Sequence, residues 1–133
     1  METSYTILAV DDEPFNLDLI EAAFMDYDDV DIVNATDGFE ALAELEKKEF
    51  DIVLLDVSMP NMDGMEVLQK IRENENLLDL PVLMVTANAE IENEALEKGA
   101  TDFLSKPYNI EVLCKRTLNY AKMNSCCKKF KDA

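Results

Sequence analysis

The feature that most constrains this 133-residue chain is a short apolar run that ends abruptly in a carboxylate and a turn. Ile52 to Leu55 show no polar alternation, which is typical of a strand covered on both faces, as in a parallel sheet between helices. Asp56 follows directly, and Pro60 cannot continue a hydrogen-bonded ladder. Ligands of open α/β sheets bind at the carboxyl ends of the strands. The run therefore predicts a buried strand that delivers Asp56 to a binding edge. The alternative interpretation is that Asp56 only caps a strand or turn.

Short apolar runs alternate with stretches of helical periodicity along the rest of the chain. Strands are expected over residues 5–10, 30–34, 52–55, 82–85 and 102–104. Helices are expected over about 14–27, 37–48, 63–80, 88–98 and 109–121. Candidate helix N-caps are Asp37, Asp63, Asn88 and Asn109, and Gly99 fits a left-handed helix stop. Such alternation predicts an α/β fold of five βα units, a doubly wound parallel five-stranded sheet with helices on both faces.

Length and composition favour one domain in a reducing compartment. A chain of 133 residues builds one ordinary core, which we place at residues 1–121. Residues 122–133 are expected to be a basic C-terminal tail or the start of a linker to an absent output domain. The sequence has no apolar stretch of 18 residues and no signal-peptide pattern, so we expect a soluble cytoplasmic protein without membrane contact. The three cysteines, two of them the adjacent Cys126 and Cys127, suggest no disulfide framework.

The formal net charge of −17 bears on the partners of the chain. Residues 122–133 hold four lysines and one aspartate, so the body before them is more acidic still. An acidic body repels phosphate backbones, and we therefore expect no direct binding of nucleic acid. Metal cations and basic protein surfaces are the partners that this charge favours. Most of the acidic residues are nevertheless expected to be ordinary solvated surface.

Chemically distinctive residues follow the ends of four predicted strands. In a parallel sheet these ends meet at one edge, so we expect one cluster there: Asp11, Asp12, Asp56, Thr86 and Lys106. Several carboxylates repel one another unless a cation lies among them. A hard oxygen site with open positions suits Mg²⁺, which shares its shell with substrate phosphate. Lys106 and Thr86 supply a positive charge and a hydroxyl donor for a transferring phosphoryl group, and Asp56 is the candidate nucleophile.

Taken together, these fragments resemble the response-regulator receiver domain of two-component signal transduction, over roughly residues 5–121. The resemblance rests on five fragments in order, each weak alone: Asp11-Asp12; Leu55-Asp56 with Met59-Pro60 and Asp63-Gly64; Val85-Thr86-Ala87; Gly99-Ala100; and Phe103-Leu104-Ser105-Lys106-Pro107. It implies the flavodoxin-like strand order 2-1-3-4-5.

Carried over residue by residue, the resemblance implies a phosphorylation switch. Asp56 would accept a phosphoryl group from a phosphohistidine of a sensor histidine kinase or phosphotransfer protein. Mg²⁺ would be held by the carboxylates of Asp12 and Asp56 and the main-chain carbonyl of Ser58, with Asp11 acting through water. Lys106 would pair with the phosphate.

The resemblance also implies how phosphorylation is read. Thr86 would move to hydrogen-bond the phosphate, and Phe103 would turn from an outward to an inward rotamer. The fourth helix, fifth strand and fifth helix would form the surface that controls an output domain or protein. Homodimerisation on phosphorylation is a family habit and a hypothesis here.

Other functions remain open at the level of sequence. A Mg²⁺-dependent phosphohydrolase with an aspartyl nucleophile typically needs a second carboxylate two residues later, where this chain has Ser58. We therefore expect no enzyme acting on external substrates, only self-directed phosphotransfer and autodephosphorylation. A phosphorylation-independent interaction module is the main alternative. Met59, Met62 and Met65 surround the acceptor loop as core or as partner contacts, and we favour partner contact for Met62. Cys114 is expected to be buried and inert.

Overall fold

The computed structural model describes the backbone of residues 4–132, and the side chains within that range apart from those of residue 89 and residues 125–132. The strands are β1 (Tyr5–Val10), β2 (Val30–Ala35), β3 (Ile52–Asp56), β4 (Val82–Thr86) and β5 (Asp102–Ser105). The helices are α1 (Pro14–Phe24), α2 (Gly38–Lys47), α3 (Gly64–Glu73), α4 (Glu92–Glu97) and α5 (Ile110–Asp132), with 3₁₀ turns η1 (Glu75–Leu77) and η2 (Ala89–Ile91).

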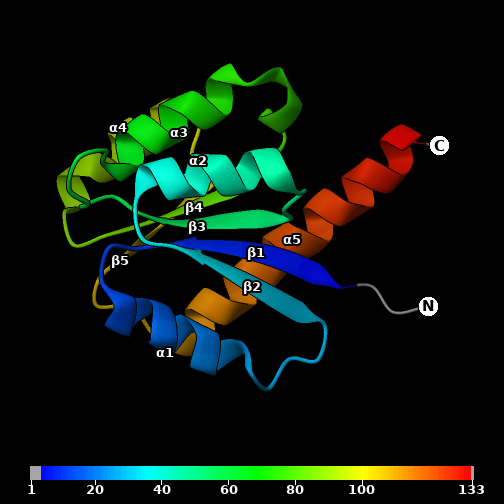
Figure 1. Ribbon diagram of the computed structural model, residues 1–133, viewed down its shortest axis with the longest axis horizontal. Coiled ribbons are helices and arrows are strands. Elements are labelled where there is room, and N and C mark those ends of the chain that lie inside the picture. The colour runs from blue at the N-terminus through cyan, green and yellow to red at the C-terminus, as the bar shows by residue number, and fades with distance from the viewer. Residues whose placement is uncertain (1–3, 133) are drawn as a thin grey trace.

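All five strands are parallel and form one sheet in the order β2-β1-β3-β4-β5. The fold class and the strand order predicted above are confirmed. β3 lies in the middle of the sheet and every one of its residues is buried, which explains why its sequence lacks polar alternation. Figure 1 shows the sheet between two layers of helices, with α2 and α3 on one side and α1 on the other.

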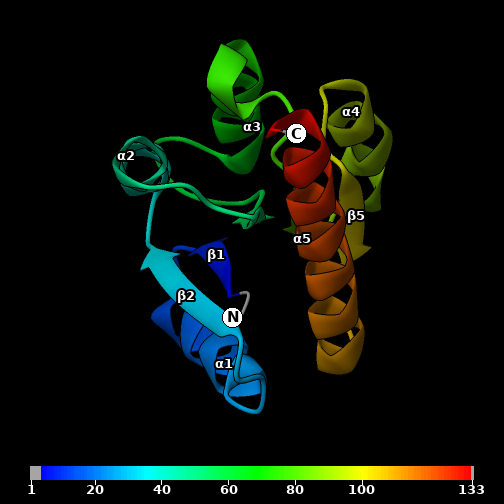
Figure 2. The ribbon, with the colours of Figure 1, turned by 90° about the vertical axis from the view of Figure 1, so that its right-hand side faces the viewer.

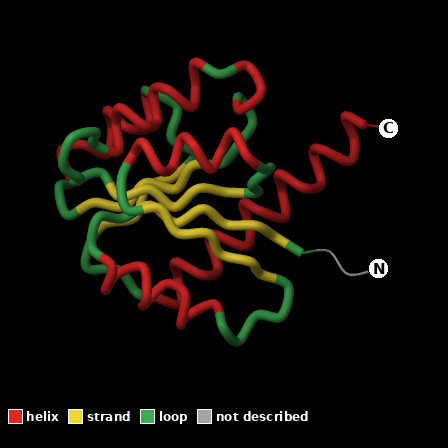
Figure 3. Tube along the Cα trace, in the orientation of Figure 1, coloured by secondary structure: helices red, strands yellow, loops and turns green. Residues whose placement is uncertain are grey.

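Two hydrophobic clusters hold the helices to the two faces of the sheet. Residues of α2, α3 and α4 pack with one set of strand side chains, including Leu8 and Val53. Residues of α1 and α5 pack with the alternate set, including Ile7 and Leu54. Because successive strand residues point to opposite faces, each buried strand contributes to both clusters. Figure 2 shows α5 and α1 on one side of the sheet, and Figure 3 shows the strands as one continuous layer.

The predicted caps of α2, α3 and α5 are confirmed. The Asp37 and Asp63 carboxylates accept hydrogen bonds from the backbone N–H groups three residues later, at 2.7 and 2.9 Å. Asn109 caps α5 in the same manner, accepting from the N–H of Glu111 at 2.8 Å. Gly99 has a φ of 109°, the left-handed conformation expected of a helix stop. Local sequence thus sets where these helices begin and where α4 ends.

Three helices are shorter than predicted. α3 ends at Glu73 and does not reach residue 80, because the N–H of Asn76 bonds to the Asn74 side chain at 2.9 Å and starts the 3₁₀ turn η1. α1 ends at Phe24, because the N–H groups of Met25 and Tyr27 bond to carbonyls three residues back and tighten the chain into a turn. The N–H of Glu90 bonds to the Asn88 side chain at 3.0 Å, which starts the 3₁₀ turn η2 instead of an α-helix. The predicted helix from residue 88 is therefore wrong in its first turn, and α4 is confined to Glu92–Glu97.

The last helix continues well past the predicted end of its apolar stripe. α5 runs to Asp132, and its residue Ala121 is fully buried. The Asn124 amide donates to the main-chain carbonyl of Asp51 at 3.3 Å, which ties the extension to the start of β3. The division into a domain over 1–121 and a tail or linker over 122–133 stays a prediction. The side chains of Cys126 and Cys127 lie outside the described residues.

Candidate functional site

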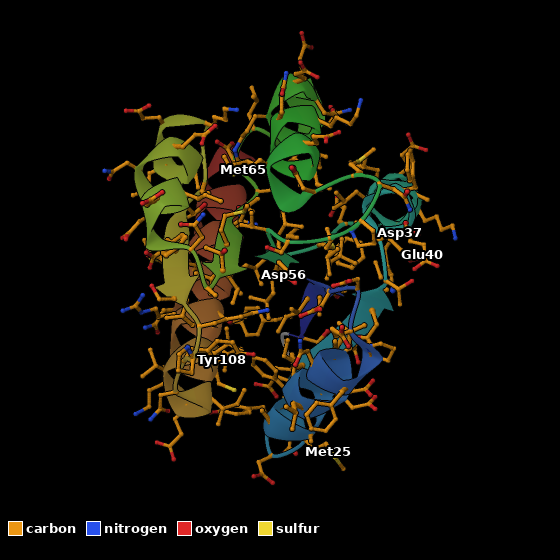
Figure 4. The ribbon with its side chains drawn as sticks, turned by 90° about the vertical axis from the view of Figure 1, so that its left-hand side faces the viewer. Met25, Asp37, Glu40, Asp56, Met65 and Tyr108 are labelled. Atoms are coloured by element: carbon orange, nitrogen blue, oxygen red, sulfur yellow. The ribbon has the colours of Figure 1, made fainter. Side chains whose placement is uncertain are left out.

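Three carboxylates meet at the carboxyl edge of the sheet. Asp56 is the last residue of β3, and Asp11 and Asp12 follow the adjacent strand β1. One oxygen atom of each lies within 4.8 Å of the others. Asp11 and Asp56 are both only 5% exposed, while Asp12 is half-buried. Figure 4 shows Asp56 in the middle of this edge. The donor set is hard oxygen throughout, which fits Mg²⁺.

Lys106 reaches the acidic cluster from the far side of the sheet. It follows β5, and its long side chain crosses the end of β4 to place Nζ 3.4 Å from Oδ1 of Asp56. The same nitrogen lies 4.0 Å from Oδ2 of Asp11. The backbone N–H of Lys106 donates to the carbonyl of Thr86 at 2.9 Å, which fixes the start of the loop. Among the side chains that the structure describes, Lys106 is thus the cation paired with this cluster, through Asp56 and Asp11.

The electrostatics of the cluster are visible in the pKa of Asp56, which is raised from 3.8 to about 6. Burial of the carboxylate is the largest cause, and repulsion by Asp11 is the second. Lys106 and the backbone N–H of Ser58, which lies 3.4 Å from Oδ1, act in the opposite direction. The carboxylate is still mostly ionised at neutral pH, so it keeps the lone pair that a nucleophile requires.

Gly64 allows the loop after β3 to fold back against Asp56. The Gly64 N–H donates to the carbonyl of Val57 at 2.8 Å. A Cβ at position 64 would collide with the main-chain oxygen of Asp56 and would lie 2.7 Å from Cα of Val57. The Ser58 side chain is exposed at the mouth of the site. Any side chain larger than hydrogen at position 64 would push the acceptor loop outward.

Met59 and Met62 belong to the core. Both are buried in the cluster on the α2 and α3 face, at 8% and 5% exposure. A Cβ on Gly38 would lie 2.7 Å from the Met62 sulfur, so the side chain fills the space between the α2 and α3 starts. Our interpretation of Met62 as a partner contact is therefore wrong. Met65 is partly buried against the same cluster.

Thr86 is the last residue of β4, and Phe103 is the second residue of β5. Thr86 is 1% exposed, and its hydroxyl oxygen accepts a hydrogen bond from the N–H of Asn88 at 3.1 Å. Phe103 is buried in the cluster on the α3 and α4 face. The guanidinium of Arg116 donates to the Phe103 carbonyl at 3.3 Å. Cys114 is buried as predicted.

Two residues beside the site were not identified from sequence. The Asn16 amide, in the first turn of α1, donates to Oδ2 of Asp11 at 3.2 Å. Tyr108 lies two residues after Lys106, and burial together with the charges of Asp11 and Asp56 raises the pKa of its phenol. Figure 4 places Tyr108 on the α5 side of the cluster. The only sequence signal for either was its short distance from a predicted site residue.

A groove of about 750 Å³ opens beside the cluster, between α1 and the segment that leads into α5. Its walls are mostly apolar, and Asn16 and Lys106 line the end next to the carboxylates. The remaining walls include Leu19, Ala22, Tyr108 and Ile110. A molecule seated in this groove would lie directly beside the acidic site.

A parallel sheet in this order, with clustered carboxylates and one lysine at its carboxyl edge, defines a flavodoxin-like domain with an acidic, cation-competent site. Comparison with known proteins gives the family. Residues 7–118 match the response regulator receiver domain, and the chain belongs to that family. The predicted membership in two-component signal transduction is confirmed.

The relatives include parts of kinases and of transcriptional regulators. The chain is 45% identical over 116 residues to the sensor histidine kinase RcsC of Escherichia coli, covering 84% of this chain and 12% of that protein. It is 39% identical over 114 residues to the probable transcriptional regulatory protein TcrX of Mycobacterium tuberculosis, covering 84% of this chain and 47% of that protein. The chain thus spans less than half the length of these curated relatives.

Solved structures of similar domains support the same assignment. The chemotaxis response regulator CheY4 of Vibrio cholerae matches with a TM-score of 0.82 at 34% identity, covering 89% of this chain and 99% of that one. The receiver domain of the sensor histidine kinase PA1611 from Pseudomonas aeruginosa matches with a TM-score of 0.81 at 29% identity, covering 90% and 99%. The latter structure has a magnesium ion coordinated in its active site cleft.

Membership of this family establishes the general function of the domain. Receiver domains are regulatory phosphoacceptor domains that bind Mg²⁺ in an acidic site and interact with sensor histidine kinases and output domains. Among the helices described, none combines the length and the apolar character needed to cross a bilayer.

Proposed function

We propose that Asp56 of this chain accepts a phosphoryl group from a phosphohistidine of a sensor histidine kinase or phosphotransfer protein. The observation that carries the proposal is the cluster itself, in which a buried, ionisable carboxylate lies 3.4 Å from a lysine and beside two further carboxylates. A carboxylate oxygen of Asp56 attacks phosphorus, the bond from phosphorus to the imidazole nitrogen breaks, and its electron pair stays on that nitrogen. The product is an acyl phosphate on Asp56.

The other residues have separate roles in this proposal. Asp12 and Asp56, with the main-chain carbonyl of Ser58, would hold Mg²⁺, and Asp11 would act through water. When bound, Mg²⁺ neutralises charge on the phosphoryl oxygens and on the carboxylates. Lys106 then pairs with a phosphoryl oxygen, for which it is already placed at the open edge of the site.

The proposed response to phosphorylation begins at Thr86. Its hydroxyl already accepts a bond from Asn88, so turning to donate to the phosphate would disturb the start of η2. Phe103 would turn between an outward rotamer and the buried position seen here. Together these changes would alter the surface of α4, β5 and α5, to which an output domain or protein would bind. Dimerisation through this surface is one form that the response would take.

The apolar groove between α1 and the segment 106–110 supports docking of the phosphodonor there, because Lys106, which contacts Asp56, lines one end of it. We propose no turnover of external substrates, since Ser58 supplies no general acid or base two residues after Asp56. Loss of the phosphoryl group to water is then the only hydrolysis expected.

Intact mass measured after incubation with acetyl phosphate tests this function. We expect one phosphoryl group on the wild type with Mg²⁺, none when Mg²⁺ is chelated, and none on Asp56→Asn. Asp18→Asn, an exposed aspartate on α1, is the matched control and should be modified like the wild type. An unmodified wild type at early and late times would refute phosphoacceptor chemistry and favour a phosphorylation-independent interaction module.

A further inference from the structure

We infer that Asn16 is a positioning residue for the metal site, acting through Asp11. The inference rests on the proposed function, since it concerns the same acidic cluster. Asn16 lies in the first turn of α1, five residues after Asp11, and its own N–H bonds to the carbonyl of Glu13 at 3.0 Å. This turn curls the chain back over the end of β1 and brings the side-chain amide to the carboxylate.

Both oxygens of Asp11 are held by neutral donors. Oδ1 accepts from the backbone N–H of Glu13 at 2.9 Å, and Oδ2 accepts from the Asn16 amide at 3.2 Å. Lys106 is 4.0 Å from Oδ2, which is beyond hydrogen-bonding distance, so Asn16 is the nearer donor. Two donors on two different oxygens fix the plane of the carboxylate and leave lone pairs of both oxygens available.

A neutral donor suits this position better than a charged one. The amide orients Asp11 without adding positive charge, so the negative charge of the cluster remains available to a cation. Mg²⁺ requires near-ideal octahedral geometry and keeps several waters, so a carboxylate that binds one of those waters must be correctly oriented. Hydrogen-bond partners behind a metal site commonly contribute 10–100-fold in affinity.

If the amide is removed, the nearest strong donor to Oδ2 of Asp11 among the described side chains is the ammonium of Lys106, at 4.0 Å. A small rotation of the carboxylate would bring the two within hydrogen-bonding distance. Rotation of the Asp11 carboxylate toward that charge would form a shorter ion pair and turn the oxygen away from the metal. The expected loss is therefore in Mg²⁺ affinity, while the fold is maintained by the two hydrophobic clusters, to which Asn16 does not belong.

Isothermal titration with MgCl₂ tests the inference on the unphosphorylated full chain. We expect Asn16→Leu, which keeps the side-chain volume but removes the donor, to raise the Kd for Mg²⁺ by about 10-fold, the lower end for such partners. Asn119→Leu, an exposed asparagine on α5, is the matched control and should bind like the wild type. Asn16→Ala should reproduce the loss, because both variants lack the amide.

Separate readouts distinguish a failure of this inference from a failure of the proposed function. Melting with EDTA shows whether the variants are folded, and phosphorylation by acetyl phosphate at saturating Mg²⁺ should recover toward the wild-type rate. An unchanged Kd in folded Asn16→Leu overturns the inference and leaves phosphoacceptor chemistry intact. A wild type that binds Mg²⁺ normally but takes up no phosphoryl group overturns the proposed function alone, and a wild type that binds no Mg²⁺ overturns both.

Discussion

Replacing Asp56 by asparagine should stabilise the metal-free protein. The pKa of Asp56 is raised from 3.8 to about 6, so the folded state binds a proton more tightly than the unfolded state does. The ionised carboxylate therefore opposes folding above the folded pKa, and this penalty disappears as the pH falls to the unfolded pKa. Asparagine has nearly the same shape and carries no charge, so it removes the penalty at every pH.

The expected gain follows from the size of the shift. At full effect a pKa change from 3.8 to about 6 corresponds to about 3 kcal/mol. Because solvent at the open edge of the sheet screens the charge of Asp56, we expect Asp56→Asn to gain about half of this free energy, ~1.5 kcal/mol. For 133 residues this raises the melting temperature by about 5 °C.

Calorimetry of the wild type and Asp56→Asn with EDTA checks both the size and the pH dependence. The gain in the free energy of unfolding of the variant over the wild type should reach its full size at about pH 8. It should decrease as the pH falls from about pH 6 to about pH 4. Saturating Mg²⁺ should shrink or reverse it, because the ion binds the folded wild type more tightly than the variant. A variant that melts at or below the wild-type temperature at about pH 8 in EDTA would refute the reasoning, as would a gain that persists undiminished at about pH 4.

Three further substitutions probe the supports of the site. Gly64→Ala should cost about 1–3 kcal/mol in chemical denaturation, because its Cβ would collide with the main-chain oxygen of Asp56, and it should slow labelling by acetyl phosphate; wild-type behaviour in both would contradict the contact. Asp63→Ala removes the cap of α3 and should lower the free energy of unfolding by about 1 kcal/mol in a urea titration, with Asp18→Ala as the exposed control. Arg72→Met removes two hydrogen bonds, to the carbonyl of Leu77 at the end of η1 and to the carbonyl of Gly99 after α4, at 2.9 Å each. It should cost about 1–3 kcal/mol and speed amide exchange near Gly99; unchanged exchange there would count against the tether.

The central strands β3 and β4 were predictable because every one of their residues is buried and neither sequence has polar alternation. β1 has the predicted bounds, whereas the other four strands each extend one residue further, to Ala35, Asp56, Thr86 and Ser105. These last residues pair with residues of neighbouring strands. The polarity of a single residue does not reveal whether its backbone pairs in this way. The meeting of the carboxylates and Lys106 followed from topology alone, since parallel strands end at one edge.

Features that depend on tertiary contacts were not predictable in the same way. An asparagine before a helix and an asparagine that starts a 3₁₀ turn look alike in sequence, which is why Asn88 was misread. The Asn16 amide is recognisable only once α1 curls over Asp11. Met62 was misread because methionine suits both cores and adaptable surfaces, and only the approach of α2 to α3 decides between them.

The arrangement of charges at the edge also explains why one lysine must come from the fifth strand. Because Asp11 follows β1 and Asp56 ends the adjacent strand β3, two nearly buried carboxylates lie close together, and each repels the charge of the other. A cation on α1 or on the loop after β3 would occupy the space that a metal and a phosphoryl group need. Lys106 instead approaches from beyond β4, close enough at 3.4 Å to offset the charge of Asp56 in the absence of metal. In the proposed phosphorylated state of Asp56, the same long side chain would follow the added negative charge outward.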